Sequence, residues 1–306
     1  MKKTLTLEGG IEVVTHAPSP NFNPLTASAA DLASNGFPAM PDDPRHRERY
    51  ARLWGKIKNK FHYVEPTFQV NRDRTHGPRK RVPAEGASTS TNWCGGVINP
   101  PAGQTFDWIE GDWVVPDVSA PTQGEWYYMA SWIGIDGDGS NDVFQAGVAS
   151  QVNQSGTSVS KSIYPWWEWY PAGEVQITNF VVNAGDMITM VLSAKAAGAT
   201  TGTVNWINTT TGATTNATLK APSGTKLVGN CAEWIVEAPS VNGGQSALAD
   251  YGEVFFTVSE AETSAGTTVN GGAGNNINMT AGGKVISDGN LITPSIIQCL
   301  YVGSKP

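Results

Sequence analysis

Histidine is absent from most of this chain. Its four histidines, His16, His46, His62 and His76, all lie in the N-terminal quarter. A Ser-His or Cys-His couple and a zinc site built on imidazole are therefore not expected in the rest of the chain. Chemistry there has to rest on carboxylates, amides, hydroxyls and backbone groups.

Cysteine is also scarce. Cys94, Cys231 and Cys299 are too few for a disulfide framework, although one bridge and one free thiol are possible. A cysteine nucleophile would lack the histidine that usually serves as its base. The stretch that begins at Asp136 resembles a calcium loop but lacks a glutamate at the twelfth position. We expect no metal ion and no cofactor.

Long apolar runs are missing as well. No run of about 18 apolar residues occurs, so we expect no membrane span. The first residues have the basic start of a signal peptide without the apolar stretch that should follow, so no export signal is visible.

Positive charge is missing from the second part of the chain, where no arginine follows Arg81. Residues 1–87 carry 14 of the 20 Lys and Arg and 9 of the 27 Asp and Glu, a net charge of +5, whereas residues 88–306 carry −12. Such an acidic body is a poor partner for nucleic acid, and it suits acidic surroundings. We predict a basic, propeptide-like segment with a linker (1–87) and a catalytic domain (88–306).

One helix is expected in the N-terminal segment, over residues 44–60, with Asp43 as its cap. The apolar residues that recur there at helical spacing are Tyr50, Leu53, Trp54 and Ile57. The helix is either a small surface element or part of a propeptide that covers an acidic cleft. Residues 1–30 are expected to be extended or loosely ordered, and residues 71–90 to form a cleavable linker.

The residue composition changes from Asn92 onward, where short runs of Val, Ile, Thr and Trp alternate with turns of Gly, Asn, Ser and Pro. Many short strands without a persuasive helix predict an all-β fold, an antiparallel β-sandwich or barrel. The expected strands are Trp108–Val115, Gly124–Trp132, Val175–Val182, Met187–Ala194, Thr203–Thr209, Thr225–Val228, Ala232–Glu237, Glu253–Val258 and Ile292–Val302.

Aromatic residues are densest in the stretch 166–171, Trp-Trp-Glu-Trp-Tyr-Pro. Because neighbours in a strand point to opposite faces, these rings cannot all enter one core. At least one aromatic pair should lie beside Glu168, as in a cleft that grips an extended substrate.

Carboxylates alternate with apolar residues in Ala232–Glu237. Glu233 and Glu237 should share one face, and Trp234 should point from the other face into the core. The two carboxylates mark either a solvated face or the wall of a cleft. Taken alone, Gln145 is more typical of a surface amide.

Four stretches, taken in order, carry a family resemblance. They are Trp132–Gly137, Phe144–Gly147, Trp166–Pro171 and Ala232–Glu237, and Asn92-Trp93 looks like the start of a mature domain. Over residues 90–306 the chain resembles the glutamic peptidases (eqolisins). The resemblance implies a secreted, monomeric acid endopeptidase for protein or peptide substrates, made as a zymogen. It also implies a concanavalin-like sandwich of two antiparallel sheets, each of about seven strands.

By the same resemblance, Gln145 and Glu237 are the catalytic pair. The residues that match the surroundings of this pair are Asp136, Glu168, Trp93, Trp132, Trp166 and Tyr170. After Gly147 the chain reads Val-Ala-Ser-Gln, where fungal relatives have an acid and aromatics, and this departure bears on subsite preference.

Such a pair needs no histidine. A carboxylate with a reference pKa of about 4.3 can alternate between base and acid near pH 3–5, while the amide donates to the oxyanion. Asp136 and Glu168 would orient the pair. At neutral pH the positive segment should lie on the negative body, and acid should weaken that attraction and free the cleft.

Carbohydrate chemistry is the main alternative. Aromatic clefts with paired carboxylates also occur in glycoside hydrolases, with Glu168 and Glu237 then acting as acid and nucleophile about 5–5.5 Å apart. A non-catalytic carbohydrate-binding module is a third possibility. Digestion of casein, set against release of reducing sugar, would separate these functions.

Overall fold

The computed structural model describes residues 2–19, 21–41, 44–60, 62–82, 86 and 88–303, without the side chains of residues 45, 46 and 56–60. The cap predicted at Asp43 and the side chain of Ile57 lie outside the described part.

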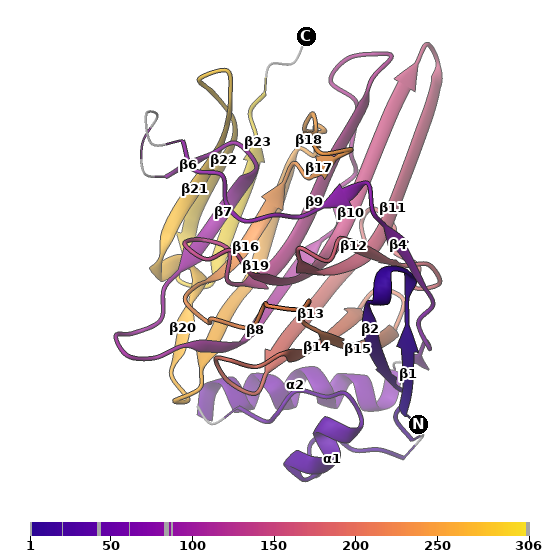
Figure 1. The fold of residues 1–306 in the computed structure, drawn as a ribbon, viewed down its shortest axis with the longest axis vertical. Helices are drawn as coiled ribbons and strands as arrows, with labels where there is room; N and C mark the ends of the chain where they lie inside the picture. Colours follow the sequence, from indigo (N-terminus) through magenta and orange to yellow (C-terminus); the bar gives the residue numbers. More distant parts are fainter. Residues whose placement is uncertain are drawn as a thin grey trace.

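Antiparallel strands make up most of the molecule, which confirms the all-β prediction (Figure 1). One run of hydrogen-bonded neighbours contains the four signature stretches. In spatial order it consists of β4 (Phe68–Asn71), β12 (Glu174–Ile177), β11 (Ser158–Tyr170), β10 (Val143–Ser155), β9 (Trp126–Ile135), β16 (Ala232–Glu237), β7 (Trp93–Ile98) and β21 (Asn275–Ala281).

A second run continues from β21. In spatial order it consists of β22 (Lys284–Thr293), β23 (Ile296–Tyr301), β19 (Glu253–Thr263), β8 (Phe106–Val114), β13 (Met187–Ala194), β14 (Thr201–Asn208) and β15 (Ala213–Lys220). Two short strands flank these runs, β20 (Thr268–Asn270) beside β19 and β6 (Thr89–Ser90) beside β21.

The largest apolar core contains side chains from both runs. Ile133 and Trp234 of the first run lie in it with Met190 and Trp206 of the second. The Trp234 indole N–H donates to the carbonyl of Glu110 on β8 at 2.8 Å. This confirms the alternation predicted for β16, because Trp234 enters the core and the two glutamates of β16 lie on the opposite face.

The aromatic stretch divides in the same way. Trp167 and Trp169 belong to the large core, whereas Trp166 belongs to a second cluster with Trp93 and Trp132, against which Tyr170 packs. The prediction that these rings cannot share one core is confirmed.

Several details of the strand prediction are wrong. Ile292–Val302 was expected as one strand, but a turn at residues 294 and 295 divides it between β22 and β23, and the strand expected over Val175–Val182 ends at Ile177. Thr225–Val228 is a loop, and its Val228 N–H donates to the carboxylate of Asp136 at 2.7 Å instead of to a neighbouring strand. The long hairpin of β10 and β11 was only partly anticipated, because polar residues from Gln151 to Lys161 carry no apolar alternation.

The N-terminal segment is folded onto the body. β1 (Lys2–Thr6) and β2 (Glu12–His16) form a hairpin that pairs with β15, and β3 (His62–Tyr63) lies parallel to β15. Of the two alternatives expected for residues 1–30, extended or loosely ordered, β1 and β2 adopt the extended one. A short helix, α1 (Ala29–Ser34), was also missed, and the Ser28 hydroxyl caps it by accepting from Asp31 N at 3.1 Å.

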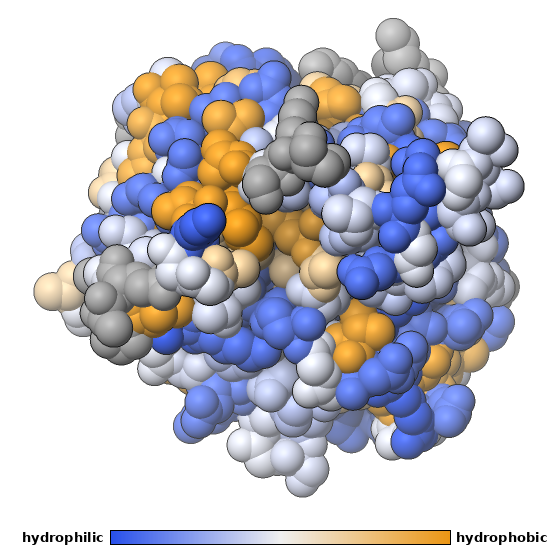
Figure 2. Space-filling model, turned by 90° about the horizontal axis from the view of Figure 1, so that it is seen from above, coloured by the Kyte–Doolittle hydropathy of each residue, from blue (hydrophilic) through white to orange (hydrophobic). Residues whose placement is uncertain are grey.

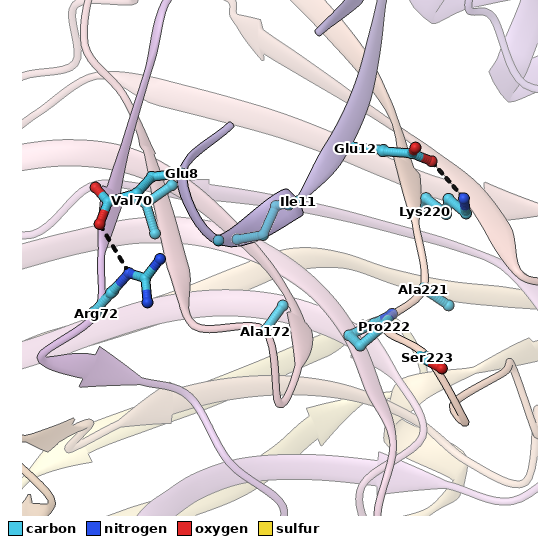
Figure 3. A pocket seen from close by; sticks show the side chains of 12 residues that line it. Glu8, Ile11, Glu12, Val70, Arg72, Ala172, Lys220, Ala221, Pro222 and Ser223 are labelled. Atoms are coloured by element: carbon cyan, nitrogen blue, oxygen red, sulfur yellow. Dashed lines mark hydrogen bonds and ion pairs between the residues drawn. The ribbon is translucent and has the colours of Figure 1, made fainter. Parts of the chain in front are cut away.

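Exposed ion pairs tie this hairpin to its surroundings. Figure 3 shows the pocket of about 590 Å³ that lies beneath the hairpin, with Arg72 paired to Glu8 and Lys220 paired to Glu12. Ion pairs in contact with water contribute little, about 0–1 kcal/mol each. The hairpin is thus held in part by contacts that salt and acid weaken.

The predicted helix is confirmed as α2 (Pro44–Lys60), which lies below β13, β14 and β15 in the view of Figure 1. Tyr50 and Trp54 are buried against Ile207 of β14. Among the helices of the described residues, none is long and apolar enough to cross a membrane.

Arg49 of α2 enters a group of carboxylates on the second run. Its guanidinium lies 2.5 Å from Glu110, 3.2 Å from Glu260 and 4.0 Å from Asp112. Burial raises the pKa of Glu110 to about 8, against the opposing charge of Arg49. The basic segment is therefore anchored on the acidic body by a partly buried cation.

Candidate active site

One face of the first run collects the predicted site residues. Gln145 on β10 lies opposite Glu168 on β11 and opposite Gly134 on β9. Glu237 ends β16, where it lies opposite Trp93 on β7. Four stretches that are far apart in sequence thus contribute side chains to one face.

Glu237 is buried and held by several donors. Its Oε2 accepts from Trp132 Nε1 at 3.0 Å, and its Oε1 accepts from Asn92 Nδ2 at 3.4 Å. Burial raises the pKa of Glu237, and the positive charge of His76 and these hydrogen bonds oppose the rise.

Gln145 is fully buried as well. Its Nε2 donates to the backbone carbonyl of His76. Its Oε1 has no hydrogen-bond partner among the described residues. The amide therefore presents its N–H group to a carbonyl oxygen that comes from the N-terminal segment.

His76 occupies the centre of the site. Its Nδ1 lies 2.9 Å from Glu237 Oε2, its Nε2 lies 2.9 Å from Glu174 Oε2, and its ring stacks on Trp166 with centroids 3.5 Å apart. Burial alone would lower the pKa of His76, but the hydrogen bonds and charges of Glu174 and Glu237 raise it to about 10. The ring is thus an imidazolium between two carboxylates.

All four histidines precede the predicted catalytic domain in the sequence, so an imidazole at this site was not expected. The expectation is right about the order of residues in the sequence, but the fold brings the His76 imidazole into the site. The segment that carries His76 passes through the site directly after β5 (Arg74–Thr75). β5 pairs with β17 (Ser240–Val241), and β17 forms a hairpin with β18 (Gly244–Gln245).

Two further glutamates complete the surroundings of His76. Glu168 Oε2 accepts from His76 N at 2.7 Å, and burial raises the pKa of Glu168 to about 8. Burial would also raise the pKa of Glu174, but the hydrogen bond and charge of His76 hold it below its usual value. Glu174 also accepts from Asn71 Nδ2 at 2.6 Å. The sequence offered no local sign of Glu174, and it marked Asn92 only as part of the apparent start of a mature domain.

The remaining predicted residues fall into two groups. Trp93 packs edge to face on Trp132 at 4.9 Å, and Tyr170 lies against Gly77, so both help to line the site. Asp136 instead accepts from Val228 N and Asn230 N at 2.7 and 3.0 Å, which fixes the loop before β16. No contact between Asp136 and the pair is seen among the described residues.

An apolar cavity of about 650 Å³ lies near this site. Lys80, Ala238 and Gln245 line it together with Tyr127 and Leu248. Figure 2 looks onto the end of the molecule that carries β17 and β18, where apolar side chains gather around a hollow.

The cysteines and the acidic loop have their own structural roles. Cys94, Cys231 and Cys299 are all free and buried. Asp138 pairs with Arg79 at 3.2 Å and with Arg81 at 2.6 Å. In the described part of the chain, no group of three His, Cys, Asp or Glu side chains is arranged to hold a metal ion.

Comparison with known families settles the class of protein. A model of the peptidase A4 family matches residues 91–301. The chain belongs to the peptidase A4 family. It is therefore a peptide hydrolase, a glutamic endopeptidase, and this membership decides against the carbohydrate alternatives.

Individual relatives of this peptidase A4 member agree. Aspergillopepsin-2 of Aspergillus niger is 30% identical over 217 residues, which cover 65% of this chain and 73% of the relative. Scytalidopepsin B of Scytalidium lignicola is 28% identical over 161 residues, 52% of this chain and 56% of the relative.

Solved structures show the same fold. The chain is similar to aspergilloglutamic peptidase from Aspergillus niger with a TM-score of 0.51 and 29% identity, over 57% of this chain and 99% of that one. It is also similar to scytalido-glutamic peptidase in complex with a peptide-based transition-state analog, with a TM-score of 0.58 and 24% identity, over 69% of this chain and 98% of that one.

Proposed function

We propose that Glu237 and Gln145 hydrolyse peptide bonds through an activated water. The observation that carries this proposal is the double contact of His76. Its carbonyl oxygen accepts from Gln145 Nε2 while its ring nitrogen lies 2.9 Å from Glu237 Oε2. A substrate carbonyl can therefore lie on the amide while a water lies on the carboxylate.

The reaction needs no group beyond this pair and a water. Glu237 takes a proton from the water as the water oxygen attacks the carbonyl carbon, and Gln145 stabilises the charge that develops on the carbonyl oxygen. The protonated Glu237 then gives its proton to the amide nitrogen as the C–N bond breaks. Trp132 and Asn92 keep the carboxyl group in place.

Acid conditions suit this arrangement. Glu237 has to be ionised to act as a base and protonated to act as an acid, so its pKa should lie near the working pH. The neighbouring Glu168, whose burial raises its pKa to about 8, stays neutral in acid and adds no second negative charge. We propose that the enzyme acts at acid pH and outside the cell. The acidic net charge of residues 88–306 supports the proposal of acid conditions.

The test is to replace each member of the pair. Glu237→Gln and Gln145→Ala should each lower turnover of a denatured protein at pH about 4 by at least 10²–10³-fold, because each removes a group used in the transition state. Gln154→Ala on β10 changes a half-buried residue and Glu253→Gln on β19 an exposed one, both outside the site, and each should leave turnover unchanged. A folded E237Q or Q145A chain with wild-type turnover would disprove the assignment.

We further infer that residues 1–87 are a propeptide and that this chain is a zymogen. Residues 74–81, here called the strap, carry His76 and lie across the site. Asn92 Nδ2 donates to the Pro78 carbonyl at 3.2 Å, and Lys80 N donates to Asn92 Oδ1 at 2.8 Å. Through His76, the strap thus occupies the side chains of Gln145 and Glu237, which a substrate and its attacking water would need.

Loss of charge on the carboxylates is the proposed trigger. Protonation of Glu174 and Glu237 would leave the His76 imidazolium buried without a counter-charge, which is strongly unfavourable. The pKa of Glu174 lies below its usual value because of His76, so release should begin below about pH 4.5.

Acid incubation tests the zymogen. The purified full-length chain should shorten by about 8–10 kDa at pH about 4, through a cut within residues 71–90. The Q145A chain, kept alone under the same conditions, should stay at full length because it cannot process itself. A wild-type chain that becomes fully active without shortening would contradict the propeptide assignment.

We also infer that the body is a two-sheet sandwich. Its first sheet would run from β12 to β21 and its second from β22 to β15, in the spatial orders given above, with seven strands in each. The large core that contains side chains from both runs supports this arrangement.

A further inference from the structure

Glu233 is a buried carboxyl group that the proposed reaction does not use. It lies four residues before Glu237 on the same face of β16 and is fully buried. Neither of its oxygens has a nitrogen or oxygen hydrogen-bond partner among the described residues, although the weakly donating thiol of Cys231 lies beside it.

The charges around Glu233 favour its neutral form. The titratable groups that act on it are Cys231, Asp136 and Asp138, and none of these is a cation. Burial raises the pKa of Glu233 well above its usual value, and the two aspartates add to the rise. An ionised carboxylate without a partner is very costly to bury, so Glu233 carries a proton and can donate it.

Gly134 opens a path from Glu233 to Gln145. Gln145, Gly134 and Glu233 lie side by side on three neighbouring strands. A Cβ atom placed on Gly134 would lie 2.8 Å from Trp132 Cζ3, 2.9 Å from Glu233 Oε1 and 3.3 Å from Gln145 Cβ, so the Trp132 ring borders this space. The missing side chain therefore lets the glutamate carboxyl lie over the middle strand, next to the base of the glutamine side chain.

The side-chain oxygen of Gln145 lacks the hydrogen-bond donor that a buried amide oxygen needs. Its Nε2 donates to a carbonyl oxygen, but its Oε1 is buried and has no partner among the described residues. A buried amide oxygen without a donor is unfavourable, and nothing then prevents the amide from rotating its oxygen toward the substrate carbonyl. A donor on Oε1 removes both problems.

We propose that Glu233 is a positioning residue that donates its carboxylic proton to Gln145 Oε1, directly or through one water. The bond fixes which end of the amide meets the substrate, so that N–H and not C=O faces the oxyanion. This inference rests on the proposed role of Gln145 and adds to it the group that orients Gln145.

Two substitutions of similar size separate orientation from packing. Glu233→Gln keeps a donor and should keep kcat within about 3-fold, whereas Glu233→Met has none and should lower kcat about 10–100-fold with little change in KM. E233M removes a buried carboxyl group but leaves Gln145 Oε1 without its donor, so its melting temperature should stay within a few degrees of the wild-type value. A merely structural role predicts the opposite, a loss of activity that follows a loss of stability.

A double-mutant cycle ties the effect to Gln145. Because Q145A should not process itself, all four chains are first processed at pH about 4 by tagged wild-type enzyme, which is then removed, and are assayed on one peptide. If Glu233 acts through Gln145, E233M should cause no further loss in the Q145A background. Full additivity, or wild-type kcat in E233M, would overturn the inference. Wild-type activity in Q145A would overturn the proposed function itself.

An infrared spectrum gives a readout that does not depend on activity. At pH about 7 the wild-type chain should show the carbonyl stretch of a neutral carboxylic acid that E233Q lacks. The same band should shift in Q145A, because the acid loses its acceptor. A wild-type spectrum identical to that of E233Q in this region would show that Glu233 is ionised and cannot donate.

Discussion

His76 brings a positive charge and a carbonyl oxygen to the two side chains proposed to carry out hydrolysis. The ring fills the place beside Glu237 where a water would act, and the carbonyl satisfies the N–H of Gln145. On the proposed mechanism a single residue would block both halves of the reaction, from a segment outside the matched family region, residues 91–301.

Replacing this residue should unblock the enzyme. His76→Ala removes the ring contacts that hold the strap beside Glu174 and Glu237, so the strap should leave the site more easily, and we expect the unprocessed chain to cleave a fluorogenic peptide at pH about 4–5 without a lag. Progress curves measure the lag, and mass spectrometry confirms full length. His62→Ala, an exposed histidine on β3, is the control and should keep the wild-type lag. The same lag in H76A would mean that other contacts of the strap close the site.

The site residues that could be predicted are those within short motifs. Gln145, Glu168 and Glu237 lie in stretches whose order resembles a family, and strand alternation gives their faces. His76 could not be found in this way, because it meets Glu237 across 161 positions of sequence. From the sequence, Glu233 was recognised only as one of two acids on one face of a strand. No local sequence pattern indicates that such an acid is neutral and donates to the amide of Gln145.

At the scale of elements, regular apolar patterns gave reliable predictions. Met187–Ala194 was predicted with the bounds that β13 has, and the spacing of Tyr50 and Trp54 located α2. Short elements of mixed composition were missed because much of their order comes from pairing with other strands. β2 is one example, since it pairs with β1 and β15, and Val13 of this strand enters the large core.

The loop at Thr225–Val228 illustrates the opposite error. Its composition is typical of a strand, but its backbone donates hydrogen bonds to a carboxylate on a turn that is distant in sequence. Asp136 adopts a positive φ of 77° and accepts from Val228 N and Asn230 N. Tertiary hydrogen bonds here override local preference, and such bonds cannot be predicted from β propensity alone.

At the scale of the whole molecule, buried acids should make the fold more stable in mild acid. Burial raises the pKa of Glu168 and Glu110 to about 8 and that of Asp136 to about 6. The folded chain therefore binds more protons than the unfolded chain between about pH 4.5 and pH 8, so stability falls as pH rises through this window. His76, with its pKa raised to about 10, acts in the same direction above pH 6.5.

Melting temperatures check this prediction. The Q145A chain, which should not process itself, is expected to melt at least about 5 °C higher at pH 5 than at pH 8. Glu168→Gln removes one of the groups responsible and should reduce the difference. A melting temperature that rises from pH 5 to pH 8 would contradict the direction of the shifts.

The N-terminal segment also terminates both ends of the strand series. β4 covers the outer side of β12, and β2 and β3 cover the outer side of β15. If the segment departs, two rows of backbone N–H and C=O groups lose their partners and can recruit a foreign strand. Activation would then carry a risk of self-association, which the shortness of β12 and the polar threonines, asparagine and lysine of β15 would limit.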